Sequence, residues 1–115
     1  MIAGSRTFND YTKAEKIISD YLRKNYFGKE IVVVSGGCRG ADKIGERYAG
    51  EKGLKKVIFG AEWGKYGRAA GPIRNEKMAK VADCVICFWD GKSAGTKSMI
   101  NLAKKYNKPV YINIV

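Results

Sequence analysis

The segment from Val32 to Asp42 carries the side chains and glycines with the clearest chemistry in the sequence. A β-branched run ends at Ser35-Gly36-Gly37 and a helical pattern follows, which is typical of a buried parallel strand that leads into a helix N-terminus. Glycines let the backbone approach a ligand closely, and the free amides of a first helical turn attract anions. Because Arg39 and Asp42 lie in the same turn, the segment predicts a site for an anionic ligand.

Two further glycine-containing turns have a similar composition. One is Gly4-Ser5-Arg6, directly after a very short apolar start, and the other runs from Asp90 to Thr96 after a strongly apolar run. The second turn combines a carboxylate with hydroxyls and glycines at a predicted helix start, a combination that suits phosphate or ribose binding.

The positions of the arginines favour a site for a small anionic ligand over an extended basic binding surface. The net charge is +11, and most of it comes from lysines spread over predicted helix faces and turns, which is typical of a solvated surface. Of the six arginines, four lie in or beside glycine-containing turns: Arg6, Arg39, Arg68 and Arg74. Guanidinium is suited to bidentate recognition of phosphate or carboxylate, so this distribution predicts one localised site.

The composition excludes several classes of function. The chain has no histidine, so histidine-based acid/base chemistry is excluded, and its three cysteines lack the spacing of a zinc site or a disulfide framework. We expect no metal and no cofactor. No apolar run approaches the roughly 20 residues of a membrane span, and no signal segment opens the chain, so we expect a cytoplasmic protein without membrane contact.

The elements that must position these turns alternate between strand and helix. After the short start, strands are predicted at 31–35, 57–59, 85–89 and 110–115, with helices before and between them. The spacing of Thr12 and Glu15 predicts a capping box for the first helix, and Pro72 predicts the first residue of the third. Residues 60–71 show no periodicity and are expected to form a loop.

This alternation predicts an α/β fold, a single Rossmann-like three-layer domain over residues 1–115 with a parallel five-stranded sheet in the order 3-2-1-4-5. The crevice of such a sheet lies beyond the carboxyl ends of strands 1 and 4, where all three turns would open. The predicted ligand-binding residues are Gly4, Ser5, Arg6, Ser35, Gly36, Gly37, Arg39, Gly40, Asp42, Arg68, Arg74, Asn75, Asp90, Gly91, Ser93, Gly95 and Thr96.

Four motifs in order resemble the YspA-like (cpYpsA-related) branch of the SLOG superfamily, a set of Rossmann-like domains related to DprA (Smf) and to the LOG phosphoribohydrolases. They are Ala-Gly-Ser-Arg at 3–6, Ser-Gly-Gly-Cys-Arg-Gly-Ala-Asp at 35–42, Gly-Arg-Ala-Ala-Gly-Pro-Ile-Arg-Asn at 67–75 and Phe-Trp-Asp-Gly-Lys-Ser-Ala-Gly-Thr at 88–96. The resemblance implies that the protein binds a nucleotide or nucleotide-derived ligand, as a sensor or a nucleotide-processing enzyme, and it is compatible with a homodimer.

The resemblance also implies two alternatives. The first is an N-glycoside or phosphoribosyl hydrolase of LOG type, in which Arg74 matches the family's arginine and Gly95-Thr96 its Gly-Thr pair. The position of the family's glutamate falls on Met99, so the remaining catalytic candidates are Asp42, Asp90 and Arg74. The second alternative is a single-stranded nucleic-acid binder of DprA type.

Residue types alone leave the roles of single side chains open. The net charge and the aromatic pair Trp63 and Tyr66 favour nucleic acid, although both rings also suit packing of their loop onto the core. Asp42 can accept hydrogen bonds from ribose hydroxyls, cap its helix or form an ion pair with Arg39.

Overall fold

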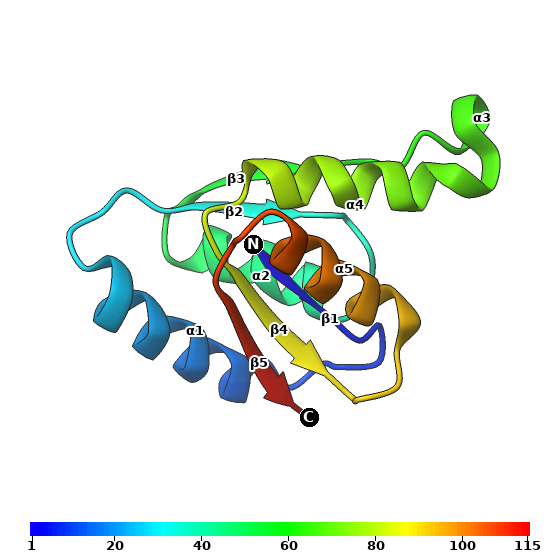
Figure 1. The fold of residues 1–115 in the computed structure, drawn as a ribbon. Helices are drawn as coiled ribbons and strands as arrows, with labels where there is room; N and C mark the ends of the chain where they lie inside the picture. Colours follow the sequence, from blue (N-terminus) through cyan, green and yellow to red (C-terminus); the bar gives the residue numbers. More distant parts are fainter.

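The computed structural model describes residues 1–115, in which strands and helices alternate along the chain (Figure 1). No helix is long and apolar enough to cross a membrane. The elements are β1 (Ile2–Gly4), α1 (Tyr11–Tyr26), β2 (Val32–Ser35), α2 (Ala41–Glu51), β3 (Lys55–Ile58), α3 (Trp63–Tyr66), a 3-10 turn η1 (Gly67–Ala69), α4 (Ala70–Val81), β4 (Val85–Trp89), α5 (Ala94–Lys105) and β5 (Val110–Ile114).

The strands lie between two layers of helices, as a Rossmann-like α/β fold requires. Successive residues of a strand point to opposite faces, so Val33 packs with α1 and α2 whereas Val34 packs with α4 and α5. Ile18 of α1 is fully buried on the first face, and Met99 of α5 is buried on the second. The predicted α/β class with parallel strand pairing is therefore confirmed.

The predicted single five-stranded sheet is wrong. The strands form two parallel sheets, one in the order β1-β4-β5 and one of β2 and β3, with no ladder between β1 and β2. Strand β1 has three residues and pairs with β4 from Ile2 opposite Ile86 to Gly4 opposite Phe88. Directly after it, the Ser5 carbonyl accepts from the Ala41 amide, so the chain bends toward α2 instead of continuing along β2.

Two of the helix starts predicted from local sequence signals are wrong. The first helix is capped by Asp10, whose carboxylate accepts from the Lys13 amide at 3.1 Å, so Thr12 lies inside the helix. Helix α4 begins at Ala70, two residues before Pro72. Within the predicted loop, α3 and η1 form single turns, which are too short to show periodicity. Figure 1 shows α3 beyond the end of α4, away from the strands.

Candidate ligand-binding site

A cleft of about 90 Å³ lies at the carboxyl ends of β1 and β4, where turns from distant parts of the chain meet. Eight of the predicted residues line this cleft: Gly4, Arg6, Asp42, Arg74, Asn75, Ser93, Gly95 and Thr96. They come from the turn after β1, the start of α2, the face of α4 and the start of α5. The predicted convergence of the three turns is therefore visible in the geometry of the cleft.

Arg74 of α4 reaches across the cleft to the turn after β2. Its NH1 donates to the Gly36 carbonyl at 2.9 Å, and its Nε donates to the Asn75 side-chain oxygen at 3.1 Å. A Cβ at Gly36 would lie 3.0 Å from the Asp42 carboxylate and 3.2 Å from Met78, so the glycine leaves room for these two side chains. The guanidinium is held in place with some of its donors still free for a ligand.

Asp42 supplies the one carboxylate that lines the cleft. Its Oδ2 accepts from the Cys38 amide at 3.1 Å. Burial raises the pKa of this carboxyl above its ordinary value, against the opposing effects of the Cys38 hydrogen bond and the Arg74 charge. The carboxylate lines the cleft and has acceptor capacity for a ligand hydroxyl.

The N-terminus of α5 forms the opposite wall. Ser93 is the N-cap residue, and no side chain caps the helix, so its first amides are available to an anion. Thr96 is buried, and its hydroxyl donates to the Ser93 hydroxyl at 3.4 Å. Arg6 also lines the cleft and is exposed, so the helix dipole and two guanidinium groups act on the same space.

Close backbone contact holds the turn after β1 against the turn before α2. Gly40 has a φ of 79°, and a Cβ there would lie 2.4 Å from the Ser5 carbonyl oxygen. The buried Ser5 hydroxyl accepts from the Asp90 amide at 3.1 Å, which ties the turn after β4 to the same point. Gly40 and Ser5 therefore bring the three turns together without lining the cleft themselves.

Several predicted residues lie behind the cleft or outside it. Ser35 is fully buried and engaged: its hydroxyl donates to Glu46 at 2.8 Å and accepts from the Gly37 amide at 3.0 Å. The Asp90 carboxylate accepts from the amides of Ser93 and Lys92 at 2.7 and 2.8 Å, and these bonds lower its pKa. The exposed residues that do not line the cleft are Arg39, Arg68, Asp90 and Gly91.

The cleft also has apolar lining that the sequence reasoning did not include. Ala3, Cys38 and Met78 line it, together with Met1 and Met99. Met78 lies one helical turn after Arg74, so the helical spacing was the signal that could have identified it. No group of three or more Cys, Asp or Glu side chains is arranged to hold a metal ion.

Comparisons with known proteins support the family resemblance that the sequence motifs indicated. Residues 1–66 match the model of the YAcAr family, described as the YspA, cpYpsA-related SLOG family. The chain is similar to the Gene 61 protein of Mycobacterium phage D29, with 36% identity over 118 residues that cover 96% of this chain and 91% of that protein. No solved structure matches the chain significantly.

Proposed function

Because the chain belongs to the YspA, cpYpsA-related SLOG family, we propose that it binds a nucleotide or nucleotide-derived ligand in the cleft at the carboxyl ends of β1 and β4. The observation that carries this proposal is the convergence of Arg6, Arg74 and the uncapped start of α5 on one small space. All three favour negative charge, and together they suit a phosphate group.

The dimensions of the cleft indicate which part of the ligand it holds. Pockets that enclose a drug-sized ligand measure about 300–1,000 Å³, whereas this cleft measures about 90 Å³. It therefore accommodates an anchoring group such as a phosphate, and the rest of the ligand extends over the surrounding surface. Asp42, at the edge of the same space, is placed to accept from a sugar hydroxyl.

Calorimetric titration with a nucleoside and its 5′-monophosphate, diphosphate and triphosphate tests the proposal. We expect only the phosphorylated compounds to bind measurably. Arg74→Ala removes one charge-assisted contact worth about 1.5–3 kcal/mol and is expected to weaken binding about 10- to 100-fold. Arg23→Ala is the matched control, because Arg23 is an exposed arginine of α1 paired with Asp20. Equal affinity for nucleoside and nucleotide, or equal effects of the two substitutions, would contradict the proposal.

A hydrolytic role finds less support in the same geometry. Met99 is buried and lines the cleft, so the position that carries the glutamate in the related hydrolases faces the site without a carboxylate. Asp42 is the remaining acidic group in the cleft, and we infer that a reaction here depends on it. Release of a free base from a nucleoside monophosphate, lost in Asp42→Asn with binding retained, would add an activity to the proposed binding.

One observation favours a second candidate, binding of single-stranded nucleic acid. Trp63 on α3 is 58% exposed and lies against Gly71 of α4 rather than in the core. An exposed aromatic ring on a protein with a net charge of +11 suits base stacking. Binding of an oligonucleotide that weakens steeply with salt and falls in Trp63→Ala would favour this candidate, whereas salt-independent nucleotide binding would favour the first.

A further inference from the structure

The two helical layers differ in the balance of their charges. Helices α1 and α2 together carry six basic and five acidic side chains, whereas α4 and α5 carry six basic and one acidic. The basic residues of α4 and α5 are Arg74, Lys77, Lys80, Lys97, Lys104 and Lys105. The net positive charge of the helices is therefore concentrated on one layer of the fold.

Ion pairing increases this difference between the layers. On the α1–α2 layer, neighbouring side chains of opposite charge neutralise one another, as Arg47 and Glu51 do at 2.7 Å. On α4 and α5 the one acidic residue is Glu76, which accepts from the Tyr106 hydroxyl and lies 3.8 Å from Lys105. The exposed lysines of these two helices that form no ion pair are Lys77, Lys80, Lys97 and Lys104. Their ammonium groups are free to bind an external anion.

The lysines of α4 and α5 lie on one outward surface. The two helices pack side by side over the strands (Figure 1). Lys80 of α4 and Lys105 of α5 lie over the same Tyr106 ring, 5.6 and 5.4 Å from its centre. We call this surface the α4–α5 basic face, and its residues are Lys77, Lys80, Lys97, Lys104 and Lys105.

A shallow groove of about 400 Å³ runs along the α5 part of the face. Four of its six lining residues are polar, and Lys97 and Lys105 lie toward its two ends. Eight residues of α-helix separate these lysines, which corresponds to about 12 Å. Ser98 and Asn101 line the groove between them and add neutral hydrogen-bond donors. The groove therefore suits an elongated anion with regularly spaced charges.

The side chains of the face indicate the class of this anion. Val81 is the only exposed large apolar side chain of the two helices, so the face lacks the apolar stripe of a membrane-surface helix. Protein interfaces are enriched in aromatic residues and arginine and depleted in lysine, which is the opposite of this composition. Tyr106 is half-buried beneath lysines, so it offers no free ring for stacking a base. Lysine is suited to phosphate as a flexible point charge.

We propose that the α4–α5 basic face binds the phosphate backbone of double-stranded nucleic acid without reading its sequence. Backbone contacts by lysine carry no direct sequence information, and a duplex presents a higher density of charge than a single strand. The face is separate from the cleft that contains Arg6 and Asp42, and from the exposed ring of Trp63 on α3. Binding here is therefore independent of the nucleotide site.

Fluorescence anisotropy with a labelled DNA duplex of about 20 base pairs tests the proposal. Each lysine–phosphate contact releases condensed counterions, so about four contacts give a slope of about −3.6 in the logarithm of the binding constant against that of the salt concentration. We expect the affinity to fall about 150-fold between about 50 and 200 mM NaCl. A single strand of the same length is expected to bind more weakly, because its charges are less dense.

Two double variants with the same change in net charge separate the face from the charge of the whole protein. Lys77→Gln with Lys97→Gln is expected to weaken duplex binding at least about tenfold at about 100 mM NaCl and to reduce the salt slope by about 2. Lys16→Gln with Lys24→Gln, at exposed lysines of α1, is the matched control and is expected to change the affinity less than about twofold. Thermal melts of both variants are expected to match the unsubstituted protein, since lysine and glutamine have similar helix propensities.

Three results would overturn the proposal. Equal losses in the two double variants would show that binding depends on the overall charge and not on this face. Tighter binding of the single strand, lost in Trp63→Ala, would place nucleic acid on α3. Binding of polyglutamate or of phosphatidylserine vesicles as tight as that of the duplex, with the same loss in the α4–α5 variant, would show a surface for any anionic polymer or membrane.

Discussion

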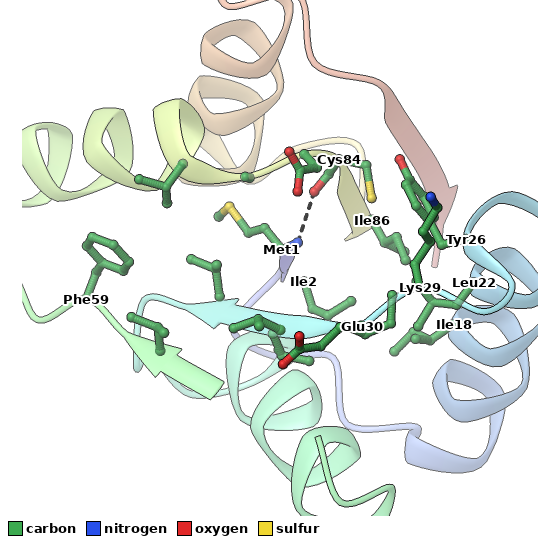
Figure 2. A pocket seen from close by; sticks show the side chains of 18 residues that line it. Met1, Ile2, Ile18, Leu22, Tyr26, Lys29, Glu30, Phe59, Cys84 and Ile86 are labelled. Carbon is green, nitrogen blue, oxygen red and sulfur yellow. Dashed lines mark hydrogen bonds between the residues drawn. The ribbon is translucent and has the colours of Figure 1, made fainter. Parts of the chain in front are cut away.

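At the carboxyl ends of the strands the cleft measures about 90 Å³, and five of its thirteen lining residues are hydrophobic. At the amino ends of β1, β2 and β4, a space of about 690 Å³ lies around Met1 (Figure 2), and fifteen of its eighteen lining residues are hydrophobic. The largest apolar pocket is usually the first hypothesis for a binding site. Here the arginines, the carboxylate and the free helix start all converge on the smaller space, so chemistry and not size selects the candidate site.

The two ends also differ in how they are held. At the carboxyl end, Gly40 packs against the Ser5 backbone and the Ser5 hydroxyl accepts from the Asp90 amide, so three turns are joined at Ser5. At the amino end, β1 and β2 share no ladder. The carboxyl end is therefore closely packed at the point where Gly40 contacts Ser5, whereas no ladder joins β1 to β2.

One added methyl group at the carboxyl end tests the close packing there most severely. Gly40→Ala forces a residue with a φ of 79° into contact with the Ser5 carbonyl, and we expect a loss of about 3 kcal/mol in the free energy of unfolding. Gly50→Ala is the matched control, since it lies in α2 with nothing within 4 Å of the added Cβ, and it is expected to gain up to about 1 kcal/mol. Urea denaturation measures both. Similar stabilities for the two variants would show that the turns are not closely packed.

A smaller effect is expected from Ser35, which supports the turn after β2 from behind. Ser35→Ala leaves the Gly37 amide and the Glu46 carboxylate without their buried partner, so we expect a loss of about 1–3 kcal/mol. Denaturation of Ser98→Ala, at an exposed serine of α5, supplies the control and is expected to change stability little. If Ser35→Ala left the free energy of unfolding unchanged, the turn would be positioned by Gly40 and Arg74 alone.

The pH dependence of stability distinguishes the two aspartates of the carboxyl end. The pKa of Asp42 is raised mainly by burial, so deprotonation costs stability as the pH rises from about 3.8 through the raised value. Asp42→Asn removes that cost, and its stability relative to the unsubstituted protein is expected to increase with pH over this window. The pKa of Asp90 is lowered by hydrogen bonds from Ser93 and Lys92, so Asp90→Asn is expected to show the opposite slope. Thermal melts between pH 3 and pH 7 measure both, and parallel slopes would contradict the burial of Asp42.

Much of the carboxyl end could be predicted from the sequence, because its signals are local. The apolar run from Val85 to Trp89 forms β4 as predicted, and the glycine turns follow β1, β2 and β4 where the alternation of elements placed them. Arg74 and Gly36 come from separate motifs, and their hydrogen bond joins those motifs in the cleft. Residue type and chain order sufficed for this part of the site.

The amino end could not be predicted in the same way. Whether β1 pairs with β2 depends on tertiary geometry, and the bend at Ser5 toward Ala41 leaves no local trace in the sequence. Ile18 and Leu22 lie four residues apart and so share one helical face, but a helical stripe does not show whether the space beside it is filled. The cavity is a property of how the elements meet, and no periodic pattern encodes it.

A milder test concerns the room at the amino end, with the same substitution at an exposed and a buried valine. Val32 lines the space at the amino ends of the strands and is 42% exposed, so Val32→Phe adds a ring to open space and is expected to stay within about 1 kcal/mol of the unsubstituted protein. Val85 of β4 is buried in the core and does not line that space, so Val85→Phe is expected to cost about 1–3 kcal/mol through overpacking. Urea denaturation of the pair measures the difference. Equal costs would mean that this space is closed in solution.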